Sequence, residues 1–285
     1  MGKVVKEAYY SQAPLEKTPH YHPCHQILLI LQGEVKILVN GQRMTAGPGK
    51  LVLFSRYENH GVTVCEEPYV RYVLQLEQPA GQQEERLFSV LSHRPAGFGN
   101  VLDVSDDLEG FSELLAGIVD ELAAQPSMTE EMQQLLVRQL LIRIYRRHPE
   151  LAAHLENERY AAVFALQRRL EEQYDQQVKL EELAKDYAMS ISSLSHRFKL
   201  VTGSSVMDYL LSCRIAAAKQ YLTQTQIGIG QIVELCGFAD VSNFGRTFKK
   251  LTGFSPSGFR EHYGEWNGSA QKRTQKHRQN NRKNR

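Results

Sequence analysis

Short apolar runs separated by turn residues occupy the chain between about Gln26 and Leu76. The runs are rich in β-branched and aromatic residues, as strands are. They are Ile27–Leu31, Val35–Val39, Leu51–Phe54 and Tyr69–Leu76. Gln32-Gly33 and Asn40-Gly41 are dipeptides of the hairpin type, and Gly47-Pro48-Gly49 is a further break. Short strands at this spacing predict a small antiparallel barrel or sandwich.

Two apolar stripes with helical spacing follow Asp106. The first consists of Phe111, Leu114, Leu115, Ile118 and Leu122, and the second of Leu135, Leu136, Leu140, Leu141 and Ile144. Pro126, Ser127 and Thr129 end one helix and cap the next. The pattern predicts an antiparallel helix pair. Its surplus of apolar positions serves either to pack the pair on its own barrel or to join two copies of the chain, and the pattern favours neither.

Beyond the polar, charged segment from His148 to Arg159, nearly the whole chain has helical spacing, and one stretch occurs twice. The hexapeptide from Phe198 to Gly203 (FKLVTG) has a similar copy from Phe248 to Gly253 (FKKLTG), a spacing of 50 residues. The similarity continues upstream, where Leu180 aligns with Ile229 if the turn of the second copy is one residue longer. Such a repeat predicts two copies of one unit, a helix, a turn and a helix, at about residues 180–201 and 229–251.

Each copy has an inner face that builds a small core. In the first copy the predicted inner residues are Leu180, Leu183, Ala184, Tyr187, Ile191, Leu194, Phe198 and Val201, with Ser190 as the N-cap of the second helix. In the second copy they are Ile229, Ile232, Val233, Phe244 and Phe248, with a tight turn at Gly237 and Asp240 as the N-cap.

The outer faces carry polar and basic groups that bond to base edges and phosphates in a major groove wide enough for one helix. They consist of Ser192, Ser193, Ser195, His196, Arg197 and Lys199 in the first copy, and Val241, Ser242, Asn243, Arg246, Thr247, Lys249 and Lys250 in the second. For one isolated helix, a solvated face is the simpler explanation. Two copies of one outer pattern favour DNA binding.

One uninterrupted helical run from Ser205 to Leu222 joins the copies. Its apolar positions are Val206, Tyr209, Leu210, Cys213, Ile215, Ala218 and Leu222. At about 1.5 Å per residue, the run spans roughly 27 Å. A rigid helix of this length can hold two recognition helices on one side of a duplex about 34 Å apart, as successive major grooves require.

Charge differs along the chain. Residues 1–156 hold 14 Lys and Arg against 20 Asp and Glu, residues 157–263 hold 13 against 11, and residues 264–285 hold 7 against 1. The net charges are therefore −6, +2 and +6, so basic charge accumulates toward the C-terminus, as expected if the second half meets a polyanion. Residues 264–285 are predicted to form a disordered basic tail.

Length and composition are those of a soluble chain with two domains of ordinary size, at 285 residues and 42% hydrophobic. The longest apolar stretch, Ile27–Leu31, is too short to cross a bilayer, and the N-terminus has no signal-peptide core, so we expect a cytoplasmic protein with no membrane partner. Four scattered cysteines without a CxxC pair indicate reduced thiols. They are Cys24, Cys65, Cys213 and Cys236.

Residues 160–263 resemble the DNA-binding domain of the AraC/XylS family. The family's second-repeat signature, which includes Ile-x-x-Ile, Gly-Phe and Ser-x-Phe-x-Arg-x-Phe-Lys-Lys, stands here from Ile229 through Arg260. Its linker-helix pattern is present as Arg214, Ile215, Ala218 and Leu222. The chain departs from the pattern at three positions: Val233 replaces the usual Ala, Gly245 takes the common Ser position, and His196 stands where the first repeat often has Arg.

This resemblance implies that some outer residues contact bases and others contact the DNA backbone. The residues implied to contact bases are Ser192, Ser195, His196, Val241, Ser242 and Arg246, and those implied to hold the DNA backbone are Arg197, Lys199, Asn243, Thr247, Lys249 and Lys250. It also implies RNA polymerase as a partner, activation of transcription and a sugar-related effector. Because His196 stands opposite Arg246, and Ser195 opposite Gly245, we expect each chain to read a nonpalindromic stretch across two adjacent major grooves.

The segment from His20 to Gln26, followed by Gly33, resembles the first cupin motif, His-x-His-x3-Glu-x6-Gly, with Gln26 at the Glu position. A looser second motif has Gly49, then Lys50 at an Asp position, then His60. The resemblance covers about residues 18–77 and implies a small-ligand pocket. Its candidate polar groups are His20, His22, Gln26, His60 and Tyr72. The simplest alternative is that the histidines support turns and the barrel rim.

Cupins include metal enzymes, so a metal-dependent cupin enzyme is the rival function of this domain. His20, His22 and His60 would then form a three-histidine site for zinc, iron or manganese. Gln26 is a poor substitute for an anionic ligand, and a chain that ends in a DNA-binding domain needs a sensor. We therefore expect no catalysis and no metal or other cofactor.

The sequence as a whole predicts a one-component transcription regulator with an all-β cupin-like domain and an all-α double helix-turn-helix domain. The predicted parts are an effector-binding domain (1–100), a helix pair that is a candidate for homodimerisation (101–150), a linker (151–159), the DNA-binding domain (160–263) and the tail. The expected partners are double-stranded DNA and a small-molecule effector that binds the DNA-competent and incompetent arrangements with different affinity.

Overall fold

The computed structural model of the chain describes residues 4–13, 16–20, 22–39, 41–77, 87–91, 99–151 and 158–264. The predicted tail beyond residue 264 and most of the predicted linker lie outside the described residues. The chain folds into two compact units, one made of residues 1–168 and 179–209 and the other of residues 169–178 and 210–285.

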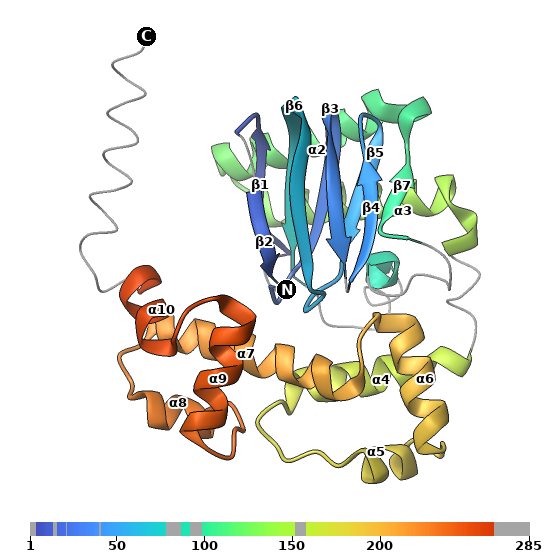
Figure 1. Ribbon diagram of the computed structural model, residues 1–285. Helices are drawn as coiled ribbons and strands as arrows, with labels where there is room; N and C mark the ends of the chain where they lie inside the picture. Colours follow the sequence, from blue (N-terminus) through green and yellow to red (C-terminus); the bar gives the residue numbers. More distant parts are fainter. Residues whose placement is uncertain are drawn as a thin grey trace. The chain divides into compact units, whose positions relative to one another are not determined.

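The first unit contains an antiparallel seven-stranded sheet (Figure 1). Its strands are β1 (Val5–Ser11), β2 (Glu16–His20), β3 (His25–Val39), β4 (Gln42–Ala46), β5 (Lys50–Phe54), β6 (His60–Leu76) and β7 (Val101–Asp103). Strands β3 and β6 pair along nearly their whole length and form the centre of the order β1-β6-β3-β5-β7. Strand β2 pairs with β6, and β4 with β3. The prediction of a β-rich, antiparallel N-terminal domain is confirmed.

One predicted turn is wrong. The expected strands 27–31 and 35–39 are a single strand, β3, and Gln32-Gly33 lies within it, where the register with β6 shifts. Gly33 has φ +80°, and an added Cβ would lie 2.5 Å from the carbonyl oxygen of Glu66. The dipeptide therefore makes a bulge, which demands the same backbone freedom as a hairpin turn. Val39 pairs with Gln42 and Gly41 has φ +85°, so β3 and β4 are neighbouring antiparallel strands, while Asn40 of the predicted turn lies outside the described residues.

The two long strands each serve two parts of the sheet. The first half of β3 pairs with β5 and its second half with β4, while the first half of β6 pairs with β2 and its last residues with β1. Side chains from both parts meet in one buried cluster, which we call the inner face. It consists of Leu28, Ile30, Val35, Ile37, Val39, Ala46, Val52, Phe54, Val62, Tyr69 and Val73. Both parts of the sheet therefore contribute to one core, and the register shifts in the long strands are of the kind that bends a strand.

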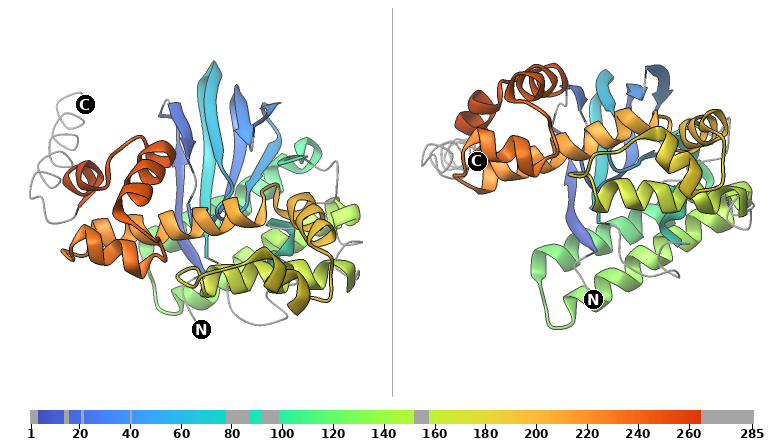
Figure 2. Two further views of the ribbon diagram at one scale, coloured as in Figure 1. Left: turned by 60° about the horizontal axis from the view of Figure 1, so that its bottom comes forward. Right: turned by 90° about the horizontal axis from the view of Figure 1, so that it is seen from below.

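The opposite side of the sheet, the helix face, is covered by α2 (Leu108–Ala124) and α3 (Thr129–Arg147), which lie side by side (Figures 1 and 2). Alternate strand residues such as Ile27 and Leu29 point to this face, as the two-residue period of a strand requires. The buried residues of the two helices are Phe111, Leu114, Leu115 and Ile118 on α2 and Gln133, Val137, Leu140, Leu141 and Ile144 on α3.

The predicted helix pair is thus confirmed as an element, and it packs on its own sheet. Two details are wrong. Leu135 is 60% exposed and lies outside the buried stripe, where Val137 takes part instead. Neither Ser127 nor Thr129 caps α3: the N-cap is Met128, and the Thr129 hydroxyl donates to the Pro126 carbonyl oxygen at 2.6 Å.

A helical segment at residues 87–91 and two 3₁₀ helices, η1 (Ser105–Asp107) and η2 (Pro149–Leu151), also belong to the N-terminal part. Seven α-helices are described in the C-terminal part of the chain. They are α4 (Glu158–Glu172), α5 (Leu180–Asp186), α6 (Ile191–Thr202), α7 (Val206–Gln224), α8 (Ile229–Leu235), α9 (Val241–Thr252) and α10 (Pro256–Tyr263). The predicted joining helix is confirmed as α7, with Val206, Leu210 and Leu222 among its buried residues. Among the described helices, none combines the length and the hydropathy that a membrane span requires.

Candidate DNA interface and effector site

The first helix-turn-helix unit consists of α5 and α6. Leu183 and Ala184 of α5 are buried, as are Leu194 and Phe198 of α6. The predicted cap is confirmed, because the Ser190 hydroxyl accepts a hydrogen bond from the backbone N–H three residues later at 3.1 Å. Together, the small core and the cap fix the orientation of α6 on α5.

Ile191 was predicted to be an inner residue of this unit, and that prediction is wrong. Its side chain is 42% exposed. Ile191 is the first residue of α6. The apolar spacing is correct, but the first turn of the helix projects beyond the two residues of α5 that form the core.

The second unit, α8 and α9, repeats this construction. Ile232 and Val233 of α8 are buried, as are Phe244 and Phe248 of α9. Asp240 is the predicted N-cap: its carboxylate accepts a hydrogen bond from the backbone N–H of Asn243 at 2.7 Å. The apolar residues and the cap therefore hold α9 as they hold α6.

The repeat extends to the C-terminal end of both second helices. The Thr202 hydroxyl donates to the Phe198 carbonyl oxygen at 2.8 Å, and the Thr252 hydroxyl donates to that of Phe248 at 2.7 Å. The glycines that follow, Gly203 and Gly253, have φ +74° and +79° and end the helices in the left-handed conformation. The repeated Thr-Gly pair of the sequence is thus a helix-ending motif.

The two turns differ, and this accounts for the additional residue in the second copy. The turn between α5 and α6 is residues 187–190, and that between α8 and α9 is residues 236–240. Ala188 adopts φ +51° at the place where the second turn has Gly237 at φ +70°. An added Cβ on Gly237 would lie 2.4 Å from the Asp175 carbonyl oxygen, so only glycine fits there.

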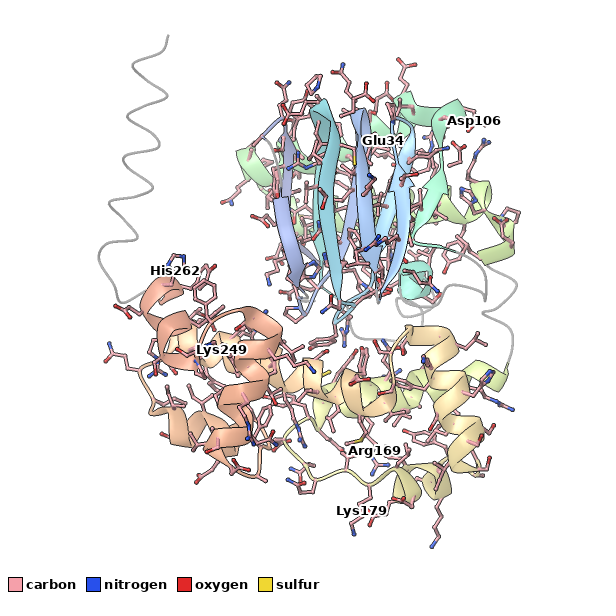
Figure 3. All side chains as sticks on the ribbon, in the orientation of Figure 1. Glu34, Asp106, Arg169, Lys179, Lys249 and His262 are labelled. Atoms are coloured by element: carbon pink, nitrogen blue, oxygen red, sulfur yellow. The ribbon has the colours of Figure 1, made fainter. Side chains whose placement is uncertain are left out.

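The outer faces of α6 and α9 are open to solvent at all the positions predicted to contact DNA. The exposed members are Ser192, His196, Lys199, Val241, Ser242, Asn243, Arg246, Lys249 and Lys250, and the partly exposed ones are Ser195, Arg197 and Thr247. The labelled Lys249 in Figure 3 belongs to this set. Buried and exposed residues follow one another in nearly the same order in the two helices. The structure therefore presents two similar polar faces.

The charge on these faces has one sign. Helix α6 carries Arg197 and Lys199, helix α9 carries Arg246, Lys249 and Lys250, and neither helix has an acidic residue. Both outer faces are therefore positively charged, as a surface that attracts a polyanion is. The hydroxyl, imidazole and guanidinium groups of the same faces supply donors and acceptors for base edges.

Two arginines of the family signature have structural contacts instead. Arg214 of α7 donates from Nε to the Tyr174 carbonyl oxygen at 2.7 Å and from Nη2 to that of Gln176 at 2.8 Å. Arg260 of α10 donates to the Ile227 carbonyl oxygen at 2.6 Å. These bonds satisfy backbone acceptors at the ends of loops and hold the helices in place.

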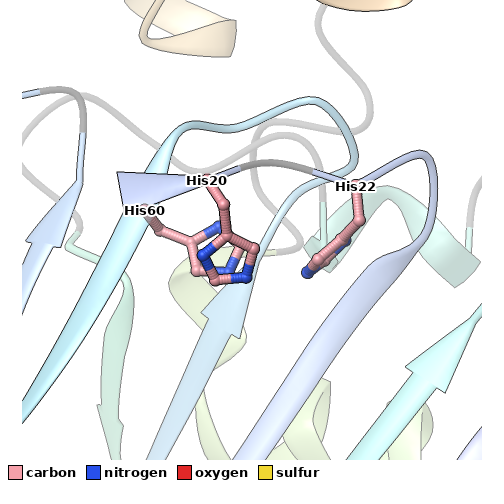
Figure 4. Close-up of side chains that lie close together, drawn as sticks. All are labelled: His20, His22 and His60. Carbon is pink, nitrogen blue, oxygen red and sulfur yellow. The ribbon is translucent and has the colours of Figure 1, made fainter. Parts of the chain in front are cut away.

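The structure brings four of the five predicted effector-site residues together. One ring nitrogen from each of His20, His22 and His60 lies within 4.8 Å of the others (Figure 4). The Oε1 atom of Gln26 is 2.8 Å from Nε2 of His22. Gln26 is directly opposite Phe54 in the sheet, and the His60 ring stacks on Phe54 at 3.9 Å, so this group borders the inner face. The donor set could hold a metal ion or orient a polar ligand.

Tyr72 is the fifth predicted residue, and the structure does not bring it to this group. It is directly opposite Leu29 in the sheet, packs with the helix-face core and contacts the ring of Tyr10, with centroids 5.4 Å apart. Successive strand residues point to opposite faces, so the position of Tyr72 relative to Val73 decides its side of the sheet.

Tyr69 belongs to the inner face and Arg71 lies two residues further along β6, and neither was singled out in the sequence analysis. They are 1% and 2% exposed, and the Arg71 guanidinium carbon is 4.2 Å from the centroid of the Tyr69 ring. Burial raises the pKa of Tyr69 to about 12. Among the described residues, the Tyr69 hydroxyl and Nε of Arg71 have no hydrogen-bond partner. The sequence signal that could have identified Arg71 is a charged residue in phase with the inner residues of a strand.

Comparisons with known proteins agree with both halves of this description. The model of an AraC-like ligand binding domain matches residues 5–142, and the model of a helix-turn-helix domain matches residues 183–262. The chain belongs to the AraC family of transcription regulators. It therefore combines a ligand-binding domain with a DNA-binding domain, and the prediction of a regulator of this family is confirmed.

Similar proteins include the arabinose operon regulatory protein of Salmonella typhimurium, 28% identical over 81% of this chain and 82% of the relative. The transcriptional activator RhaS of Salmonella schwarzengrund is 24% identical over 85% and 87%. Among solved structures, fatty-acid-bound ToxT of Vibrio cholerae has a TM-score of 0.60 at 12% identity and covers 91% of this chain and 95% of its own. The similarity to this solved structure concerns the fold alone. The two sequence relatives are named as a regulatory protein and a transcriptional activator.

Proposed function

We propose that this AraC-family regulator reads a nonpalindromic DNA site with α6 and α9 and that a small polar effector bound in the N-terminal domain controls this binding. The observation that carries the proposal is the pair of outer faces, which are alike in exposure and free of acidic residues. Two different sets of side chains on one framework are suited to two different sequences.

Base reading is assigned to six outer residues, namely Ser192, Ser195, His196, Val241, Ser242 and Arg246. The guanidinium of Arg246 can donate two hydrogen bonds to one guanine, and the imidazole of His196 differs from it in reach and in donor number. The remaining exposed groups hold the backbone; they are Arg197, Lys199, Asn243, Thr247, Lys249 and Lys250.

The effector is proposed to bind against the inner face. Gln26, Tyr69 and Arg71 are buried polar residues there, and His20, His22 and His60 border it. Buried donors that need acceptors suit an oxygen-rich ligand. A sugar has such oxygens, and the name of one relative refers to an arabinose operon.

Homodimerisation is proposed to use α3. With one face buried on the sheet, this helix and the residue before it leave four apolar side chains exposed at a spacing that places them on one side. They are Met128, Met132, Leu135 and Ile142, which are 67%, 45%, 60% and 41% exposed. A stripe of this kind is the usual means by which helices of two chains pack together.

Regulation requires that the effector binds one arrangement of the protein more tightly than the other. We propose that the favoured arrangement activates transcription through RNA polymerase, as the activator among the sequence relatives suggests.

The experiment that tests the function is selection of bound fragments from a genomic library with the purified full chain at a defined salt concentration. Recovery of fragments that share one nonpalindromic motif is the expected result. A matched selection with Arg246→Ala should recover the motif with one degenerate position. Random fragments from the unaltered protein would contradict sequence-specific binding.

A further inference from the structure

Arg71 lies on β6 between two neighbouring strands. It is directly opposite Ser11 of β1 on one side and Ile30 of β3 on the other. Residues directly opposite in neighbouring strands share a face of the sheet, so the Arg71 side chain belongs to the inner face with that of Ile30. Gln26 is four residues from Ile30 along β3, or about 13 Å at the rise of a strand. Arg71 is therefore a polar group separate from the histidines that gather beside Gln26.

Among the described residues, the hydrogen bonds of the Arg71 guanidinium all leave from one nitrogen. Nη1 donates to the carbonyl oxygens of Ala13 at 3.0 Å and Tyr69 at 3.3 Å. Nε and Nη2 have no hydrogen-bond partner in the described part of the chain. The free edge of the guanidinium is thus the one formed by Nε and Nη2. Its two parallel N–H groups match two oxygens of a carboxylate or a phosphate.

The positive charge of Arg71 has no partner of opposite sign. The residue is 2% exposed and forms no ion pair with any carboxylate that the structure describes. Two carbonyl dipoles and the face of the Tyr69 ring, whose centroid is 4.2 Å from the guanidinium carbon, offset only part of the hydration that burial removes. Because buried charges in proteins are normally paired, the missing charge is one that a ligand can bring.

Two phenol groups lie within electrostatic range of Arg71. Tyr69 is 1% exposed, and its hydroxyl has no hydrogen-bond partner among the described residues. Tyr9 of β1 packs against the inner face. Burial raises the pKa of both phenols, and the charge of Arg71 works against the rise in each. Both hydroxyls therefore keep their protons near neutral pH and can donate to an anion at Arg71.

The guanidinium lies beneath the end of an outer strand. β1 is at one end of the strand order, and its last residue, Ser11, is partly exposed and directly opposite Arg71. The chain leaves the sheet there, and Ala13, which accepts from Arg71, is exposed. One strand therefore separates the buried charge from solvent.

We propose that Arg71 binds a carboxylate or phosphate group of the effector, with the Tyr69 hydroxyl donating a further hydrogen bond. This inference rests on the proposed control by an effector and makes it more specific: the effector is an anion, either an organic acid or a phosphorylated compound. A neutral sugar supplies acceptors but leaves the buried charge without a counter-charge. A carboxylate or phosphate supplies both, and two parallel charge-assisted hydrogen bonds fix its orientation.

The test uses the full chain and two small probes, sodium acetate and inorganic phosphate, each compared with sodium chloride at the same ionic strength and pH. Calorimetry follows the melting transition of the N-terminal part, because a ligand that binds the folded state raises its melting temperature. The expected result is a saturable rise with at least one probe. A rise with acetate alone indicates a carboxylate in the effector, and a rise with phosphate alone indicates a phosphate.

Variants connect the rise to the proposed contacts. Arg71→Met should weaken binding of the effective probe about 10- to 100-fold, and Tyr69→Phe about 10-fold, as expected for hydrogen bonds to a charged group. Arg71→Lys keeps the charge without the paired donors, so its affinity should lie between those of the unaltered chain and Arg71→Met. Arg43→Met, at an exposed position of β4, is the matched control and should leave binding unchanged.

The proposal is overturned if neither probe raises the melting temperature above that in chloride, or if Arg71→Lys and Tyr69→Phe both leave the rise unchanged. These two variants keep the result decisive should Arg71→Met fail to fold. Arabinose is measured beside the anions, and a rise with this neutral sugar alone would support an effector site and reject the anion. Failure of the DNA selection, which contains none of these probes, would contradict the proposed function and leave the anion result standing.

Discussion

Gly237 lies in the turn between α8 and α9, and replacing it with alanine tests how tightly that turn is fixed. The residue has φ +70°, a conformation that costs an L-residue about 1–2 kcal/mol. The added Cβ would also lie 2.4, 2.8 and 2.9 Å from three backbone atoms of Asp175, so the segment around Asp175 must move.

That movement has a second cost. Arg214 donates hydrogen bonds to the carbonyl oxygens of Tyr174 and Gln176, on either side of Asp175. Each hydrogen bond from a charged group contributes about 1.5–3 kcal/mol. Losing one of them in addition to the backbone strain gives a total of about 2.5–5 kcal/mol for Gly237→Ala. For a unit of about 100 residues, this lowers the melting temperature by at least about 10 °C.

Two other glycines provide matched controls. Gly253 has φ +79° with no atom within 4 Å of an added Cβ, so Gly253→Ala should cost only the strain of about 1–2 kcal/mol. Gly245 lies inside α9 with open space around it, and Gly245→Ala should stabilise the unit by up to about 1 kcal/mol. Calorimetry of the full chain, resolving the transition of the DNA-binding part, gives all three values. Equal losses for Gly237→Ala and Gly253→Ala would refute the role assigned to the contact with Asp175.

Four further outcomes are expected. Arg246→Ala should cost about 1–3 kcal/mol at one base position in competition binding and leave other positions unchanged; equal weakening on every sequence would assign Arg246 to a phosphate. Leu135→Glu should shift the chain toward monomer in sedimentation, with little change in melting temperature, because the side chain is 60% exposed. Ala188→Gly should raise stability by about 0.5–1 kcal/mol, since it relieves φ +51°. Burial lowers the pKa of Lys219 from 10.5 to about 8, so the unfolded chain holds more protons between these values. The unfolding free energy contributed by this group therefore rises with pH in that window, and Lys219→Met should remove the rise in denaturant titrations.

The helical repeat was predictable from the sequence because its periodicity, its helix caps and its helix endings all indicate the same structure. Three local signals agree in the first copy: the period of Leu194 and Phe198, the cap at Ser190 and the left-handed ending at Gly203. None of them depends on contacts outside the small core of the unit. The exposure of Ile191 was not predicted because periodicity gives the direction of a side chain and not how far the neighbouring helix extends.

The sheet was less predictable because its shape depends on distant pairings. A dipeptide such as Gln32-Gly33 is compatible with either a hairpin turn or a bulge within a strand, and the pairing of β3 with β6 selects the bulge. The alternation of side chains along β6 then places Tyr72 on the helix face, away from the histidines, and Arg71 in phase with the inner-face residues Tyr69 and Val73. The spacing of His20 and His22 indicated a site, while the approach of His60 required the pairing of β2 with β6.

The account's central claim is that one chain reads two different sequences with α6 and α9. Methylation interference on a selected fragment tests it most directly, with the unaltered chain, His196→Ala and Arg246→Ala compared on the same DNA. The account predicts two groups of major-groove contacts about one helical turn apart, with His196→Ala losing a contact from one group and Arg246→Ala losing a contact from the other. A single group of contacts, or losses from the same group in both variants, would contradict it.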